Sequence, residues 1–221
     1  MSHYIYYSMR SFTVWLIAIC CCLSWSARAD EIQHFGLQRL TLENGLASNT
    51  LFEIHQDKKG FLWLGTDVGL SRYDGVHFHY YDLFQVEPQA IERICEMEAD
   101  NLLWLKLGRH SQIACFDKTT GLYIPLKTAQ KELLDNIHDI CIADSALYVL
   151  TSEGISRLDY RYNGKDITIT PVVVTEYAIP LKKLDCDKSQ LYALDAANNI
   201  QIYNYRNKTK NIFKYERLKT N

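Results

Sequence analysis

The chain has 221 residues, with 24 basic and 26 acidic side chains and a formal net charge of −2 at neutral pH. A nucleic-acid partner would call for a basic stripe, so this charge balance excludes that class of partner. After the first thirty residues no stretch stays apolar for the roughly 20 positions that a membrane-spanning helix needs, so we expect the remainder to be soluble.

Residues 1–29 have the three-part layout of a secretory signal peptide. Arg10 precedes an apolar run over residues 12–23, which is too short to span a membrane, and the Ala-Arg-Ala of residues 27–29 is a small-x-small cleavage site. Cleavage after residue 29 would remove two arginines and no acid, changing the net charge from −2 to −4. We therefore expect export from the cytoplasm; an uncleaved membrane anchor is the alternative.

Residues 30–49 are expected to form a leading strand and a linker. Within them the stretch HFGLQRLTL at 34–42 alternates like a strand, although it precedes the first complete repeat of the chain.

From residue 50 the chain repeats a pattern of short strands. The segments 51–75, 91–117, 137–159 and 181–204 each contain an alternating strand, a polar turn, a second strand with a central aromatic residue, another turn and a third strand. The central aromatic residues are Trp63, Trp104, Tyr148 and Tyr192, at intervals of 41, 44 and 44 residues. In addition, GLSRYD at 69–74 returns as GISRLD at 154–159, which is 85 residues later. A period of about 40–50 residues with several short strands and no helical pattern indicates β-propeller blades.

We accordingly predict an all-β chain of four four-stranded antiparallel blades, at about residues 50–88, 89–130, 131–178 and 179–221. The inner strands should begin near Thr50, Glu92, His138 and Lys182. Asp57–Gly60 suits a short hairpin with glycine in the left-handed conformation, and Asp74-Gly75 is a two-residue hairpin signal. One blade has two apolar faces and must stack against its neighbours to bury them, which explains why the aromatic residues recur.

Residues 43–82 closely resemble the two-component regulator propeller repeat, which opens the periplasmic sensor region of many bacterial hybrid and sensor histidine kinases. The matching elements are the Gly-Leu before the first strand, the Gln-Asp turn, the Gly-Phe-Leu-Trp strand and the Gly-Leu-Ser-Arg-Tyr-Asp-Gly strand. Later blades depart from the repeat, with Asn101 and Ser145 in place of the turn glycine.

The resemblance implies a longer protein, with further blades, an immunoglobulin-like domain, a membrane helix and a cytoplasmic kinase. It also implies an inner-membrane anchor, a homodimer and a periplasmic location for the propeller. Counting strands gives the same expectation, because the fourth repeat has its own outer strand at 211–215 and leaves no vacancy for a strand at 34–42. We expect an N-terminal portion of a larger propeller; a complete four-bladed propeller is the alternative.

Four cysteines follow the proposed cleavage site, namely Cys95, Cys115, Cys141 and Cys186. They lie one to each strand-like segment, without the close pairs of a metal site. Export makes disulfides possible, but we interpret these residues as small buried hydrophobes.

Few residues point to site chemistry. His77 and His79 share one side of an outer strand, but no third ligand lies nearby, so we predict no metal site and no cofactor. Trp63 and Trp104 could stack on a sugar, yet their place in second strands favours packing between blades. Arg109 and His110 are weak candidates for ligand binding, because they lie in a hairpin two residues longer than its counterparts.

Two functions compete. The first is a ligand-sensing module of a transmembrane kinase, with a small molecule or an oligosaccharide as the ligand that the resemblance implies, and with no catalytic residue in the chain itself. The second is a secreted propeller enzyme, such as a lyase or a glycosidase. The family resemblance, and the lack of a visibly convergent set of histidines or carboxylates, favour the sensor.

Overall fold

A computed structural model describes residues 39–82, 89–108, 111–129, 134, 136–176, 181–187 and 189–214. Apart from Arg39, these residues belong to one compact unit, Leu40–Asn221. The predicted signal peptide and residues 34–38 lie outside the described residues. Among the described residues no helix has the length and apolar character to cross a membrane.

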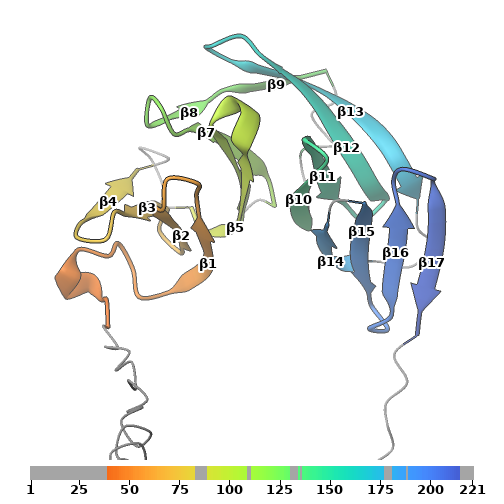
Figure 1. Cartoon of the computed structure of the whole chain (residues 1–221), viewed down its shortest axis with the longest axis horizontal. Coiled ribbons are helices and arrows are strands. Elements are labelled where there is room, and N and C mark those ends of the chain that lie inside the picture. Colours follow the sequence, from red (N-terminus) through yellow and green to blue (C-terminus); the bar gives the residue numbers. More distant parts are fainter. Residues whose placement is uncertain are drawn as a thin grey trace, which may run out of the picture. The chain divides into compact units, whose positions relative to one another are not determined.

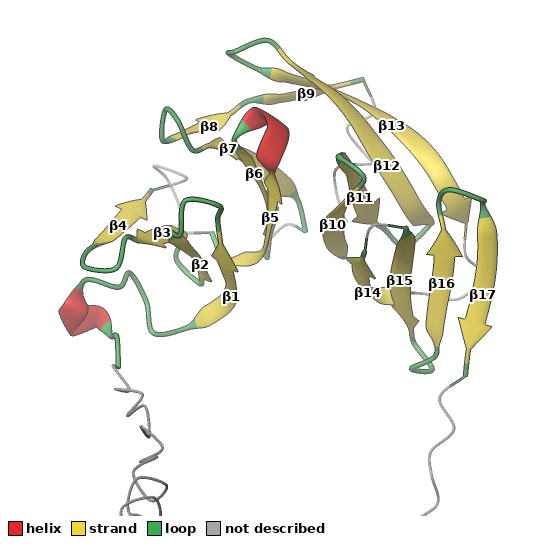
Figure 2. Cartoon of the chain, viewed as in Figure 1, coloured by secondary structure: helices red, strands yellow, loops and turns green. Residues whose placement is uncertain are grey.

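The described strands form four sheets that follow one another in chain order (Figures 1 and 2). The first contains β1 (Leu51–Gln56), β2 (Leu62–Thr66), β3 (Leu70–Tyr73) and β4 (Phe78–Tyr81). The second contains β5 (Ile91–Met97), β6 (Leu102–Leu107), β7 (Ile113–Asp117) and β8 (Leu122–Ile124). The third contains β10 (Asp139–Ala143), β11 (Ala146–Leu150), β12 (Gly154–Tyr162), β13 (Ile167–Glu176) and β9 (Leu126–Thr128). The fourth contains β14 (Leu181–Cys186), β15 (Gln190–Asp195), β16 (Ile200–Asn204) and β17 (Thr209–Phe213).

The predicted all-β architecture of four antiparallel blades is confirmed, with one difference. The first strands of the four sheets begin at Leu51, Ile91, Asp139 and Leu181, each one residue from its predicted start. The third sheet, however, has a fifth strand, because β9 pairs in parallel with the beginning of β13. β13 has 10 residues, and β9 pairs with the edge of its first three, Ile167 to Ile169.

The strand predicted at 34–42 is wrong in its described part. Residues 39–41 belong to no strand, and Leu42–Asn44 form a short 3₁₀ helix, η1. Local hydrogen bonds explain the difference, because the Asn44 side chain accepts from the backbone N–H of Thr41 at 2.9 Å. Gly45 then ends the turn in the left-handed conformation, with φ of 95°. Such bonds between side chain and backbone compete with an extended conformation.

The turns use left-handed residues where the hairpins need them. Gly60 has φ of 86°, as its hairpin predicts, and Asn101 takes the same role with φ of 59°. Asp144 and Ser145 both have positive φ, which suits a two-residue hairpin. The two-residue hairpin predicted at Asp74-Gly75 is wrong, because Tyr73 pairs with Phe78 and leaves a four-residue loop.

Three apolar clusters lie between successive sheets. The cluster between the first two sheets includes Trp63, which is 1% exposed and lies edge-to-face on Phe116 at 5.6 Å between ring centroids. The indole N–H of Trp63 donates to Asp57 Oδ2 at 2.9 Å. Trp104 is likewise buried and packs on Tyr160 of the third sheet. Both tryptophans therefore join sheets, as predicted.

One repeated apolar position is exposed to solvent in the first sheet and buried in the other three. In the second, third and fourth sheets this position is held by Ile94, Ile140 and Leu184, which are at most 3% exposed. The equivalent residue of β1, Ile54, is 59% exposed, because no described sheet precedes β1. On the fourth sheet Ile200, Ile212 and Phe213 are exposed as well.

Candidate functional site

The first strands of the four sheets bring together two layers of polar side chains. Opposite the central aromatic residue of each sheet lie His55 in β1, Cys95 in β5, Cys141 in β10 and Asp185 in β14. Two residues earlier, and hence on the same face of each strand, lie Glu53, Arg93, Asp139 and Lys183. This second layer alternates between acid and base from one sheet to the next.

A cavity of about 810 Å³ lies along β1, β5, β10 and β14. The charged and titratable part of its wall includes Glu53, His55, Lys58, Arg93, Glu96 and Asp185. No phenylalanine, tyrosine or tryptophan is among the described side chains that line it. A ligand in this cavity would therefore be held by hydrogen bonds and charge and not by ring stacking.

Asp139 connects three of the first strands. Its carboxylate is almost completely buried and accepts the backbone N–H of Leu184 in β14 at 3.0 Å and that of Ile140 at 3.0 Å. The Arg93 guanidinium from β5 lies 3.9 Å from one oxygen, and Lys183 Nζ lies 3.9 Å from the other. Asp139 thus fixes where β10 and β14 meet and also holds Arg93 at the cavity.

A second polar network joins the first two sheets beside the same cavity. His55 Nε2 lies 3.1 Å from Glu96 Oε2, and the other oxygen of Glu96 is paired with Lys118. Lys118 Nζ also lies 3.7 Å from the buried Asp57, which receives the Trp63 indole N–H. The network anchors His55 to the packing between the sheets.

Burial and charge change the acidity of two groups in the cavity. Burial raises the pKa of Glu53 above the usual range of a glutamate, and the nearby Arg93 guanidinium only partly opposes this. Burial alone would lower the pKa of Arg93, but Asp139 and the other acidic groups around it outweigh that effect and raise it. Arg93 is therefore a permanent cation, and Glu53 takes up a proton more readily than an exposed carboxylate does.

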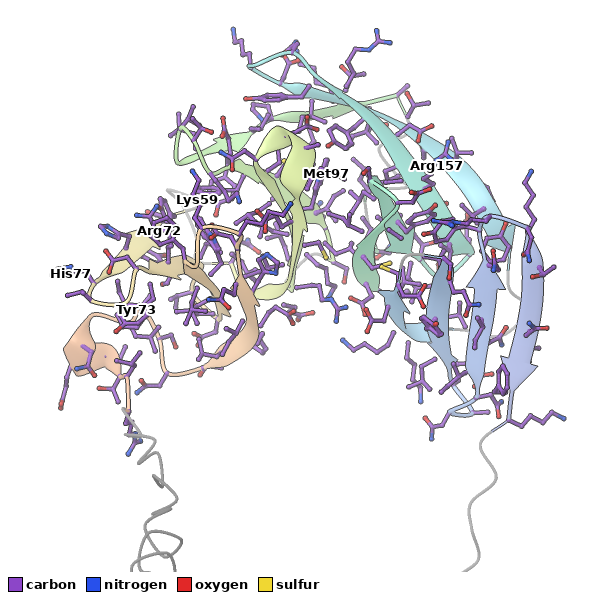
Figure 3. The ribbon with its side chains drawn as sticks, viewed as in Figure 1. Lys59, Arg72, Tyr73, His77, Met97 and Arg157 are labelled. Carbon is purple, nitrogen blue, oxygen red and sulfur yellow. The ribbon has the colours of Figure 1, made fainter. Side chains whose placement is uncertain are left out.

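The candidates predicted from the sequence are not among the described residues that line this cavity. Arg109 and His110 are outside the described residues, so their role in binding stays a prediction. His77 lies in the loop before β4, at the edge of the first sheet (Figure 3), and its Nδ1 is 4.0 Å from Asp74. His79 Nε2 lies 3.7 Å from the same carboxylate. Within the described part of the chain no three or more His, Cys, Asp or Glu side chains are grouped so that they could hold a metal ion.

Sequence reasoning missed the cavity. His55, Glu53 and Glu96 meet there although they come from two repeats. The available signal was the polar residue at alternate positions of each first strand. Alternation alone, however, also describes an ordinary solvent-exposed strand face.

No protein-family model matches the chain. Over 81 residues, or 37% of its length, the chain is 31% identical to a protein of Formosa agariphila named histidine kinase P4, and the match covers 6% of that protein. The structure is similar to the extracellular domain of a hybrid two-component system from B. thetaiotaomicron, with a TM-score of 0.59 and 19% identity over 80% of this chain and 26% of that one. It is also similar to virginiamycin B lyase from Staphylococcus aureus, with a TM-score of 0.55 and 15% identity over 76% of this chain and 56% of that one.

These similarities establish the fold. The chain consists of β-propeller blades, of the kind found in the extracellular domain of a hybrid two-component system and in a lyase. It spans 6% of the length of the curated relative and 26% of the length of the solved sensor domain.

Proposed function

We propose that this chain is the ligand-sensing propeller region of a two-component sensor histidine kinase, and that it binds an oligosaccharide in the cavity along the first strands. The observation that carries the proposal is the convergence of charged side chains from successive repeats, at equivalent positions, on one cavity. The sequence match to a histidine kinase and the shared fold with an extracellular sensor domain support it.

The composition of the cavity wall favours a ligand rich in hydroxyl groups. Its four acids, Glu53, Glu96, Asp144 and Asp185, outnumber its two cations, Arg93 and Lys58, so the cavity offers both hydrogen-bond acceptors and donors, with an excess of acceptors. Carboxylates accept hydrogen bonds from hydroxyl groups and guanidinium donates to them, and bonds to charged groups are the stronger ones. An oligosaccharide offers both kinds of partner without a large net charge of its own.

The same cavity bears on the alternative of a propeller enzyme. His55 beside a carboxylate is an arrangement that a lyase could use as a general base. Here Glu96 already engages the Nε2 atom of His55, and Glu96 is itself neutralised by the buried Lys118. This favours an anchoring role for His55, and we propose that the chain binds its ligand and does not transform it.

Further blades and a kinase would lie elsewhere in the whole protein. The exposure of Ile54, at a position that is buried in the next three sheets, supports a further blade packing on β1. We further propose a homodimeric protein that is anchored in the inner membrane, with the propeller in the periplasm.

Ligand binding can be tested with a panel of neutral and acidic oligosaccharides, measured by isothermal titration calorimetry on the purified chain. At least one class should bind, and Arg93→Gln should weaken its affinity by about tenfold or more, because a hydrogen bond to a charged group contributes roughly 1.5–3 kcal/mol. Glu53→Gln, which keeps the shape of the side chain, should also weaken it.

Two matched substitutions serve as controls for this experiment. Arg157→Gln removes a cation on β12 that is paired with Asp159 away from the cavity (Figure 3), and Glu43→Gln removes an acid in η1. Neither should change the affinity. Unchanged affinity in folded Arg93→Gln and Glu53→Gln variants would place the ligand elsewhere, and degradation of a bound oligosaccharide would establish the enzyme alternative.

Export gives a separate prediction. The chain expressed in a bacterium with a periplasm should lose residues 1–29, because their layout is that of a cleaved signal peptide. N-terminal sequencing of periplasmic material should begin at Asp30. A product that begins at Met1 and stays in the membrane fraction would show an uncleaved anchor instead.

A further inference from the structure

Three neighbouring first strands each carry a cysteine at the cavity, namely Cys95 in β5, Cys141 in β10 and Cys186 in β14. All are free thiols in this structure. Cys141 belongs to the apolar cluster between the third and fourth sheets, and Cys186 packs against the same cluster. Cys95 packs against the cluster between the second and third sheets. The three thiols therefore divide into one pair and one separate residue.

The contacts between β10 and β14 bring Cys141 and Cys186 together. The two strands are held at the Asp139 carboxylate, which accepts the backbone N–H of Leu184 at 3.0 Å. Two residues further along each strand lie Cys141 and Cys186, whose side chains pack in the same apolar cluster. The Cys186 thiol donates to the carbonyl of Ile142, with Sγ 3.1 Å from the oxygen. By contrast, Cys95 Sγ faces the carbonyl of Ile140 at 3.7 Å.

The two paired thiols differ in access and in acidity. Cys186 is only partly buried, and the hydrogen bond from Cys141 lowers its pKa, with further help from the Arg93 guanidinium against burial and neighbouring acids. Cys141 is 2% exposed, and the bond to Cys186, together with burial, raises its pKa far above the usual value. A thiolate is the reactive form in disulfide exchange, so an external reagent meets Cys186 first.

We propose that Cys141 and Cys186 form a reversible dithiol/disulfide site, oxidised by exchange with an external disulfide. The Cys186 thiolate attacks one sulfur of the disulfide RS–SR, so that a mixed disulfide forms on Cys186 and RS⁻ leaves and takes up a proton. Cys141 then loses its proton, attacks the Cys186 sulfur and releases the second RS⁻, which is protonated in turn. In total, two thiols and RS–SR give one protein disulfide and two RSH, and the external disulfide is reduced.

This bond would join the first strands of the third and fourth sheets at the wall of the cavity. It would close a loop from residue 141 to residue 186, and cross-links of this kind stabilise mainly by restricting the unfolded chain. We expect the oxidised protein to melt roughly 5 to 10 °C higher than the reduced protein. The site does not depend on the identity of the ligand, so it can be tested without one.

The probe is oxidised glutathione. The chain, with the three cysteines of residues 20–22 replaced by serine, is incubated with it, remaining thiols are alkylated, and the peptides are identified by mass spectrometry. Cys141 and Cys186 should be recovered as a linked pair, with Cys95 and Cys115 alkylated. Dithiothreitol should reverse the link and the rise in melting temperature.

Single serine variants distinguish the order of the two steps. Cys141→Ser should trap glutathione on Cys186, whereas Cys186→Ser should leave Cys141 unmodified. Cys95→Ser is the matched control, because it removes a cavity thiol outside the pair, and the link should still form. Linkage of Cys95 to either residue, or four alkylated thiols in the folded, oxidant-treated chain, would overturn the proposal. The peptide map of the chain that keeps both Cys141 and Cys186 decides this even if one of the single variants fails to fold.

Discussion

Replacing Trp63 by alanine is expected to lower the free energy of unfolding by about 3 to 5 kcal/mol, the range found for buried tryptophans and phenylalanines. Trp63 is 1% exposed, packs on Phe116 of the second sheet and on Tyr81, and donates its indole N–H to Asp57. The variant would lose these contacts and leave a cavity between two sheets. Urea denaturation followed by circular dichroism should show the loss as a lower midpoint with a similar slope.

Two further variants separate the parts of this effect. Trp63→Phe keeps a ring against Phe116 but removes the donor to Asp57, so a smaller loss of about 1 to 3 kcal/mol is expected. Tyr192→Ala removes the equivalent aromatic residue of the fourth sheet, which is partly exposed, and should be milder than Trp63→Ala. A Trp63→Ala protein as stable as the parent, but unable to bind oligosaccharide, would make Trp63 a ligand contact.

Replacing Asp139 by alanine is expected to destabilise the chain by about 1 to 3 kcal/mol, because the buried backbone N–H of Leu184 is left without an acceptor. Arg93 would lose one of its two ion-pair partners and keep the other, Asp185, at 3.3 Å. The third and fourth sheets would then lose their polar contact at the cavity. Thermal unfolding of the parent and the variant at equal concentration measures the effect.

The chain offers a conservative variant and an exposed counterpart as controls. Asp139→Asn keeps one oxygen for the Leu184 N–H but removes the charge and replaces the oxygen that accepts the Ile140 N–H by an NH₂ group, so it should recover only part of the lost stability. Asp159→Ala breaks an exposed ion pair with Arg157, which should change stability by less than about 1 kcal/mol. Equal effects of Asp139→Ala and Asp159→Ala would mean that Asp139 does not hold the sheets together.

The cavity was beyond prediction because its residues are defined by position in space and not by a motif. Glu53 and Arg93 are 40 positions apart in the sequence, and each looks like one polar residue in an alternating strand. Only the packing of β1 beside β5 turns them into neighbours in one wall. The same holds for Cys141 and Cys186, which the sequence presents as unrelated residues of two repeats and which the structure packs in one apolar cluster.

Sequence periodicity determined the blades themselves. Alternating strands, turn residues and an aromatic residue every 41 to 44 positions act locally, so they predicted the four sheets and their first strands to within one residue. The pairing of β9 with β13, the 3₁₀ turn at Leu42–Asn44 and the charged layer from Glu53 to Lys183 were decided by tertiary structure or by specific side-chain bonds. A repeated pattern specifies how each unit folds, whereas the chemistry of a shared cavity depends on which residue each unit contributes where the units meet.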